Sequence, residues 1–188
     1  MAFARLLVSS TADANSFPAT VNEFKSFSAL NEAVAAHFKD RSVILDAEIV
    51  SLSDDGKSQF YDLLFRCGEP RLCAFDVLWC DGENLCYAPL IERKQRLRGL
   101  LSGSNERLLY CDHIEQYGES LFRLACQHDV EGIVAKRKYD PYRPNLASWF
   151  KIRNPNYSQW AGREELFERE RESDPDLHHW GVCVEACK

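Results

Sequence analysis

Residues 42–50 read Ser-Val-Ile-Leu-Asp-Ala-Glu-Ile-Val, and this stretch decides the expected fold. Apolar side chains occupy every second position, which predicts a strand with one buried face: Val43, Leu45, Ala47 and Ile49. Asp46 and Glu48 share the opposite face of that strand. Such carboxylates either contact a divalent metal or ribose hydroxyls, or they face solvent, and this stretch alone favours solvent.

Similar patterns predict further elements. The predicted strands are 72–79, 108–113, 132–137 and 149–153, and the predicted helices are 28–39, 89–101, 120–128 and a charged segment 162–172. Ser28 is a candidate cap of the first helix, and Leu121, Leu124 and Ala125 are expected to point inward from the third. Residues 1–21 show no sustained periodicity. Strands and helices do not alternate regularly, which predicts an α+β fold with antiparallel sheets flanked by helices.

Composition places the chain among globular proteins, with 45% hydrophobic and 12% aromatic residues in 188. The net charge of -6 is unevenly distributed: residues 136–153 hold six bases and one acid, whereas residues 164–188 hold eight acids and three bases. A basic stretch of this kind is either a phosphate-binding surface or a solvated face. Because the sequence shows neither a membrane span nor a secretory signal, we expect a cytoplasmic protein with free thiols.

The strand predicted at 149–153 places Trp149, Lys151 and Arg153 on one face. Two neighbouring cations can bind a phosphate between them. They can also protect an exposed edge strand from aggregation, and this strand alone does not distinguish the two interpretations. In the strand before it, Glu131 and Lys136 could hold a metal ion and a phosphate, or be a turn acid and a surface lysine.

Four segments together are more specific than each alone: 46–50 (Asp-Ala-Glu-Ile-Val), 75–76 (Phe-Asp), 131–136 (Glu-Gly-Ile-Val-Ala-Lys) and 149–153 (Trp-Phe-Lys-Ile-Arg). In order and spacing they resemble the nucleotidyltransferase domain of ATP-dependent DNA ligases. That domain belongs to the covalent nucleotidyltransferase superfamily and has an ATP-grasp-like fold. The resemblance covers about residues 22–172, and further stretches are similar to short bacterial ligases: 22–27, 59–65 and 156–162.

The resemblance implies nick sealing in DNA repair and recombination. A lysine of the complete enzyme attacks the α-phosphate of ATP, AMP passes to the 5′-phosphate of a nick, and the 3′-hydroxyl displaces it. ATP, Mg2+ and nicked double-stranded DNA are the implied cofactors and partner. The implied ATP or AMP contacts are Glu48, Phe75 (stacked on adenine), Lys136, Lys151 and Arg153, and the implied metal contacts are Glu48 and Glu131.

The sequence departs from the family pattern at the residue that carries the chemistry. Its 188 residues contain no Lys-x-Asp-Gly, so no catalytic lysine is assigned, and the family's Arg-Asn-Gly is missing before Asn22. Ala47 replaces the usual glycine, and Arg153 stands where the family often has lysine. We therefore expect a ligase-family remnant that does not adenylylate itself.

We hypothesise that a shifted reading frame explains why the family's N-terminal motifs, here called the head, are absent. Plausible codons for residues 1–6, read one nucleotide earlier after a G, give Asp-Gly-Phe-Arg-Ala-Leu, and residues 11–21 give a segment ending in Arg-Asn-Gly. The expected organisation is an out-of-frame, incomplete head at 1–21, a partial nucleotidyltransferase domain at 22–163 and an acidic helix and tail at 164–188. We expect no OB-fold domain. The alternatives are a non-catalytic module that binds nucleotide or nicked DNA, and an RNA ligase or guanylyltransferase.

Overall fold

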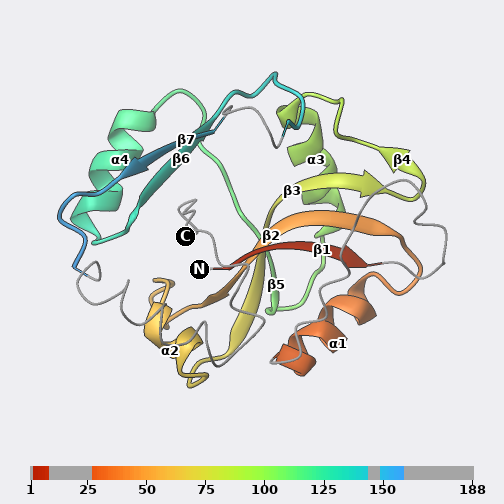
Figure 1. The fold of residues 1–188 in the computed structure, drawn as a ribbon, viewed down its shortest axis with the longest axis horizontal. Coiled ribbons are helices and arrows are strands. Elements are labelled where there is room, and N and C mark those ends of the chain that lie inside the picture. Colours follow the sequence, from red (N-terminus) through yellow and green to blue (C-terminus); the bar gives the residue numbers. More distant parts are fainter. Residues whose placement is uncertain (1, 9–26, 144–148, 159–188) are drawn as a thin grey trace.

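The computed structural model describes residues 2–8, 27–143 and 149–158 of the chain (Figure 1). Its elements are β1 (Ala2–Val8), α1 (Ser28–His37), β2 (Val43–Ser51), α2 (Phe60–Leu64), β3 (Pro70–Cys80), β4 (Glu83–Asn84), α3 (Leu90–Leu100), β5 (Leu108–Tyr110), α4 (Gly118–Gln127), β6 (Gly132–Lys136) and β7 (Trp149–Arg153). The predicted helix at 162–172 and the whole acidic tail at 164–188 lie outside the described residues. None of the described helices has the length and apolarity that crossing a bilayer requires.

Two sheets organise the described residues. The large sheet has the order β1-β2-β3-β4, and β5 also pairs with β3, while β6 and β7 form a separate two-stranded sheet. All pairs are antiparallel except β3 with β5, which is parallel, so the predicted antiparallel arrangement is correct for every other pair of strands. The β3–β4 hairpin turns at Asp81 and Gly82, which both have positive φ, as the Asp-Gly sequence predicts.

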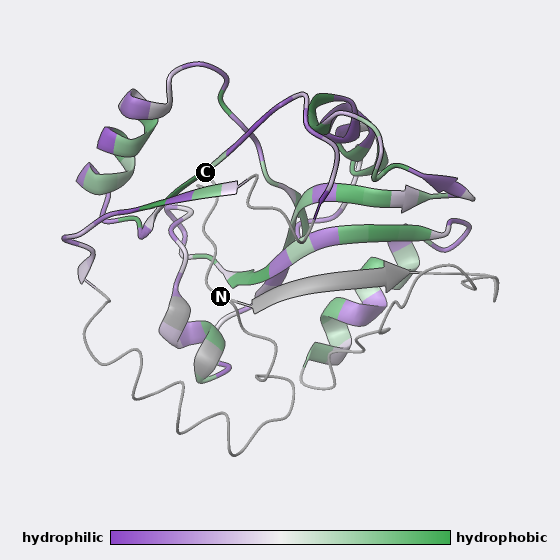
Figure 2. Ribbon diagram, turned by 45° about the horizontal axis from the view of Figure 1, so that its top comes forward, coloured by the Kyte–Doolittle hydropathy of each residue, from purple (hydrophilic) through white to green (hydrophobic). Residues whose placement is uncertain are grey.

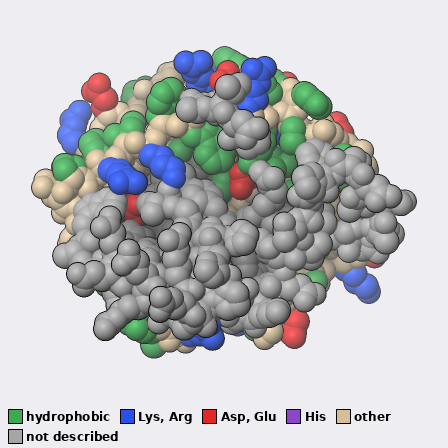
Figure 3. All heavy atoms as spheres, in the orientation of Figure 1, with side chains coloured by type: hydrophobic (Ala, Val, Ile, Leu, Met, Phe, Trp, Pro, Cys, Tyr) green, Lys and Arg blue, Asp and Glu red, His purple; other side chains and the backbone are tan. Residues whose placement is uncertain are grey.

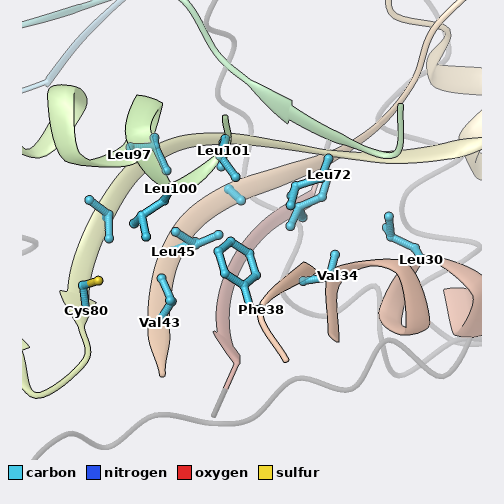
Figure 4. Close-up of a cluster of buried hydrophobic side chains, with 14 of the residues drawn as sticks. Leu30, Val34, Phe38, Val43, Leu45, Leu72, Cys80, Leu97, Leu100 and Leu101 are labelled. Atoms are coloured by element: carbon cyan, nitrogen blue, oxygen red, sulfur yellow. The ribbon is translucent and has the colours of Figure 1, made fainter. Parts of the chain in front are cut away.

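The main core lies on one face of the large sheet. Helices α1 and α3 both cover this face (Figure 4), and they contribute buried residues that include Leu30, Val34, Phe38, Leu97 and Leu100. The strands contribute their alternate residues, among them Val43, Leu45, Ala47 and Ile49 of β2. The predicted inward face of residues 42–50 is therefore confirmed. In Figure 2, β2 and β3 are mostly hydrophobic, with short hydrophilic stretches near the middle of the sheet.

Several local predictions were wrong. Helix α1 begins at Ser28 itself, after Phe27, and no side chain caps it. Leu124 of α4 is 43% exposed, whereas Ala125 is buried as predicted. Residues 2–8, which showed no periodicity, form β1 and pair with β2 along their whole length. The five-residue helix α2 was not predicted at all.

Candidate functional site

The face of the large sheet opposite the main core carries two buried carboxylates. Asp46 and Glu48 are each only 6% exposed, so the interpretation of these residues as solvent-facing acids was wrong. The Tyr142 hydroxyl donates a hydrogen bond of 2.9 Å to Asp46 Oδ2, and Glu48 Oε1 is inaccessible to solvent. Since burial of carboxylates is costly without compensation, these two acids make this face a candidate binding site.

Phe75 lies on this face at a β-bulge. Asp46 lies opposite Asp76 and Ala47 opposite Ala74, so Phe75 is an extra residue of β3 with no residue directly opposite. A bulge of this kind re-aims a side chain and increases the local twist. Ala74 packs in the main core, whereas Phe75 packs in a second cluster on the other face of the sheet. Alternation after Ala74 places the Phe75 ring on the face of the two carboxylates, and the bulge leaves Asp76 opposite Asp46.

The ammonium group of Lys136 lies between two aromatic rings. Its Nζ is 4.4 Å from the centroid of the Phe75 ring and 4.2 Å from that of the Trp149 ring, and it is inaccessible to solvent. The Phe75 and Trp149 rings meet edge to face, with centroids 6.2 Å apart. Cation–π attraction of this kind strengthens when the cation is desolvated. Lys136 is therefore part of the site, and the interpretation of it as a surface lysine was wrong.

The register of β6 and β7 explains this arrangement. Lys136 pairs with Trp149, Val134 with Lys151 and Gly132 with Arg153. Because paired residues share a face of the sheet, Lys151 and Arg153 follow Trp149 along the face that carries Lys136. Both are exposed. On the molecular face drawn in Figure 3, Lys and Arg side chains gather at the upper edge and again left of centre.

Glu131 lies at the other end of β6. It is buried, and its carbonyl oxygen accepts a hydrogen bond of 2.7 Å from the Asn154 amide. Lys136 lies five steps along an extended chain from Glu131, a span of about 16 Å between their Cα atoms. The structure thus brings Phe75 and Lys136 together, with Glu48 on the same face of the large sheet as Phe75, while Glu131 immediately precedes β6, which ends at Lys136.

Three residues of this region were not assigned a role from the sequence: Arg93, Tyr142 and Trp149. Arg93 forms a buried, two-point ion pair with Asp76, with Nε and Nη2 each 2.8 Å from a carboxylate oxygen. The Tyr142 ring meets the Trp149 ring at a centroid distance of 6.1 Å. Trp149 belongs to the motif at 149–153. Arg93 lies 17 residues from its partner Asp76, and Tyr142 lies 96 residues from its partner Asp46. Such separations leave no local signal in the sequence.

Hydrogen bonds join the two ends of the small sheet next to Glu131. Both the hydroxyl and the amide of Ser158 donate hydrogen bonds to the Asp129 carboxylate. Asn154, which is buried, donates through Nδ2 to the Val130 carbonyl oxygen at 3.0 Å. The segment after β7 is thereby fastened to the segment before β6, which fixes the end of the sheet where Glu131 lies.

We expect the Asp129 contact to make stability depend on pH. The Ser158 hydroxyl, and then its amide, hold the pKa of Asp129 below its ordinary value of 3.8. A lowered pKa in the folded state contributes stability that is complete above about pH 4 and is lost as the pH falls through the lowered pKa. The free energy of unfolding of Asp129→Asn should therefore fall less steeply on acidification than that of the wild type, in urea titrations from about pH 6 to about pH 2. Equal slopes would show that the contact is not formed.

Comparison with known proteins agrees with this geometry. A family model described as "ATP dependent DNA ligase domain" matches residues 5–153, which is most of the chain. The chain therefore belongs to the ATP-dependent DNA ligase family, as its four motifs predicted.

Individual relatives are similar at moderate identity. The SPbeta prophage-derived DNA ligase-like protein LigB of Bacillus subtilis (strain 168) is 27% identical over 153 residues, which cover 73% of this chain and 56% of LigB. The multifunctional non-homologous end joining protein LigD of Mycolicibacterium smegmatis is 32% identical over 124 residues, which cover 64% of this chain and 16% of LigD. The chain thus spans only part of these relatives.

Among solved structures, the mycobacterial DNA ligase D complexed with ATP and MES matches with a TM-score of 0.58 and 29% identity, over 66% of this chain and 42% of that one. The predicted fold class, a mixture of helices and antiparallel sheet like that of ligase nucleotidyltransferase domains, is therefore confirmed.

Proposed function

We propose that this chain binds ATP over the face of the large sheet that carries Glu48 and Phe75. The observation that supports this proposal is that buried Glu48 and Phe75 share this face of the large sheet, and that the Lys136 ammonium group lies over the Phe75 ring. An aromatic ring suits a base, a carboxylate suits a ribose hydroxyl or a metal ion, and a lysine suits a phosphate.

Each proposed role follows the chemistry of its side chain. Phe75 stacks on adenine, Glu48 accepts hydrogen bonds from ribose hydroxyls, and Lys136 neutralises phosphate charge. Lys151 and Arg153, exposed on the face that carries Lys136, extend the positive charge along β7.

Mg2+ is the metal that suits the acidic residues proposed here. The described residues contain no group of three or more His, Cys, Asp or Glu side chains that could enclose a metal ion by themselves. That fits Mg2+, which is usually bound by one or two carboxylates together with substrate phosphates and water. We propose Glu48 and Glu131 as separate carboxylate contacts of Mg2+, since Glu131 lies at the opposite end of β6 from Lys136, and the bound metal would offset the negative charge of the phosphates.

We further propose that ATP binding by these 188 residues is reversible and that the chain does not adenylylate itself, because the sequence has no Lys-x-Asp-Gly. The test is incubation with α-labelled ATP and Mg2+, followed by denaturing electrophoresis and, separately, calorimetric titration. We expect heat of binding but no labelled band. A covalent protein–AMP adduct would contradict the second statement, and the lack of any binding would contradict the first.

Replacing Phe75 with leucine should weaken ATP binding about 5- to 150-fold, because stacking of a base on an aromatic ring contributes about 1–3 kcal/mol. Leucine keeps most of the apolar volume and removes the aromatic face. Calorimetry gives the dissociation constant, and thermal melting checks the fold. The matched control is Phe65→Leu, since Phe65 is an exposed phenyl group outside the site. Equal losses in the two variants would exclude Phe75 as the base platform.

The second candidate function is binding of nicked DNA without catalysis. DNA binding is favoured by four exposed basic residues on β7 and on the segment after β6. They are Arg137, Arg143, Lys151 and Arg153. Binding through phosphates should weaken steeply as salt rises from about 50 to about 200 mM. A gel-shift series with nicked and intact duplexes tests it, and equal affinity for both duplexes would exclude nick recognition.

For the organisation of the chain, we propose that residues 1–21 are an out-of-frame version of a ligase head, that 22–163 are the nucleotidyltransferase part and that 164–188 are an acidic tail. The recovery of two family segments from plausible codons supports the first assignment. Sequencing the gene through codon 24 tests it, and a sequence without an overlapping Lys-x-Asp-Gly frame would refute it.

A further inference from the structure

The two sheets of the site share no strand pairing, so other contacts must set their relative position. In the described residues, Phe75 and Glu48 belong to the large sheet, whereas Lys136 and Trp149 belong to the small one. Residues 137–143, which we call the linking segment, follow β6 and run toward the first turn of α3. Their contacts with β2, β3 and α3 indicate how the two halves of the site are held together.

Main-chain hydrogen bonds join the linking segment to the start of α3. The Ile91 amide donates to the Lys138 carbonyl oxygen at 2.9 Å, and the Leu90 amide donates to the Asp140 carbonyl oxygen at 3.1 Å. First-turn amides of a helix have no partner within the helix, and no side chain caps α3. The linking segment therefore supplies the acceptors that the helix lacks. The Tyr142 amide adds a third bond, of 2.8 Å, to the Cys86 carbonyl oxygen.

Arg93 connects the linking segment to the strand that carries Phe75. Its Nε and Nη2 bind the carboxylate of Asp76, and its Nη1 donates to the carbonyl oxygens of Ala88 at 2.6 Å and Asp140 at 3.3 Å. Arg93 and Asp76 are both almost completely buried. The planar guanidinium group donates hydrogen bonds to three different partners in a fixed geometry, which the single ammonium group of a lysine could not reproduce. Because Asp76 follows Phe75 directly, Arg93 fixes the linking segment relative to the Phe75 ring.

Tyr142 makes the second connection. Its hydroxyl binds Asp46 Oδ2 on β2, while its ring contacts the Trp149 ring of β7 and lies 5.8 Å from the Arg93 guanidinium carbon. One side chain therefore touches the large sheet, the small sheet and Arg93. Trp149 is also the residue whose ring lies against Lys136 and Phe75.

We propose that Arg93 and Tyr142 are positioning residues of the nucleotide site: they hold the linking segment so that Lys136 and Trp149 of the small sheet lie against Phe75 of the large sheet. This inference rests on the proposed ATP site for its effect on binding, but the position of Trp149 can be measured without nucleotide. Neither residue needs to contact ATP, and both act through the side chains that they place.

The test uses the full chain labelled with 5-fluorotryptophan. The chain has four tryptophans, and Trp149→Phe assigns the fluorine resonance of Trp149. The variant is Tyr142→Phe, which removes only the hydroxyl group, and the matched control is Tyr139→Phe, on an exposed tyrosine of the same segment. We expect Tyr142→Phe to shift or broaden the Trp149 resonance without nucleotide and to weaken ATP binding about tenfold, since a hydrogen bond to a charged group is lost. Tyr139→Phe should change neither.

The outcomes separate the two proposals. An unchanged Trp149 resonance in Tyr142→Phe, even with a lower melting temperature, would overturn the positioning role, because a merely structural contact would alter stability alone. A wild-type chain that binds no ATP would refute the proposed function, and the fluorine spectrum would still decide the positioning role. Arg93→Lys is the second variant: it keeps the charge but loses the two-point geometry, and it should perturb the same resonance. A wild-type spectrum in Arg93→Lys would remove Arg93 from the proposal.

Discussion

Replacing Asp76 with alanine should lower the free energy of unfolding by about 3–5 kcal/mol, because it leaves the Arg93 guanidinium charge buried without its carboxylate. Asp76 has no exposed surface and the Arg93 side chain is 2% exposed, so water cannot solvate the remaining charge in the folded state. The unfolded state solvates it fully, and the whole cost of desolvation therefore falls on folding. Urea denaturation at neutral pH measures the difference.

The chain offers a matched control for this prediction. The ion pair of Arg98 with Asp112 has the same nitrogen–oxygen distance, 2.8 Å, but both of its side chains are more than half exposed. Asp112→Ala should therefore cost at most about 1 kcal/mol. Replacing the buried pair by the apolar pair Asp76→Leu and Arg93→Met should restore most of the loss, since apolar groups of similar volume need no partner. A cost for Asp76→Ala no larger than that for Asp112→Ala would contradict the buried pair.

The strands and helices that the sequence predicted correctly are those whose side chains alternate between two environments. β2 is the clearest case: its odd-numbered residues from Val43 to Ile49 pack against α1 and α3, and the period of two showed this directly. The same reasoning placed Trp149, Lys151 and Arg153 on one face of their strand, and the register of β6 and β7 agrees with it. Local periodicity was sufficient to predict a strand and its buried face wherever one face packs against the core.

The errors have a different physical origin. β1 pairs through its backbone, which every residue type can supply, so the pairing leaves no pattern in residues 2–8. The parallel pairing of β5 with β3 joins Leu72 to Leu108, which lie 36 residues apart. No turn sequence predicts a pairing over such a separation. Helix α2 has only five residues, too few for a helical period to show.

For the site, the sequence identified residue types but not their environment. A carboxylate on an alternating strand is more often solvated than buried, and the Tyr142 contact of Asp46 comes from a segment 96 residues further along the chain. Arg93 was missed for a similar reason. It lies in a helix with two other arginines; its spacing from Leu90 and Leu97 places it on the buried face, but its partner Asp76 lies on a strand 17 residues earlier.

Gly132→Ala should separate or shift the two strands of the small sheet. A Cβ atom at residue 132 would lie 2.2 Å from the Ile152 carbonyl oxygen and 3.0 Å from the Arg153 Cα. Both are backbone atoms of β7, so no side-chain rotation relieves the clash, and the strand itself must move. Overpacking of this kind costs about 1–3 kcal/mol and occasionally more. The Glu-Gly pair of the motif therefore has a steric reason for its glycine.

The larger consequence of Gly132→Ala concerns the site. Residue 132 pairs with Arg153, four positions before the pair formed by Lys136 and Trp149, so a displaced β7 carries Trp149 away from Phe75. Hydrogen exchange should show lost protection of the amides of β6 and β7, while β2 and β3 keep theirs, because the main core lies on the other face of the large sheet. Gly99→Ala is the control: its Cβ would meet no atom within 4 Å, and alanine in an exposed helix position should stabilise α3 by about 0.5–1 kcal/mol. If Gly132→Ala preserved the exchange protection of β6 and β7, the close approach of these two backbones would be wrong, and the placement of Trp149 against Phe75 and Lys136 would lose its structural basis.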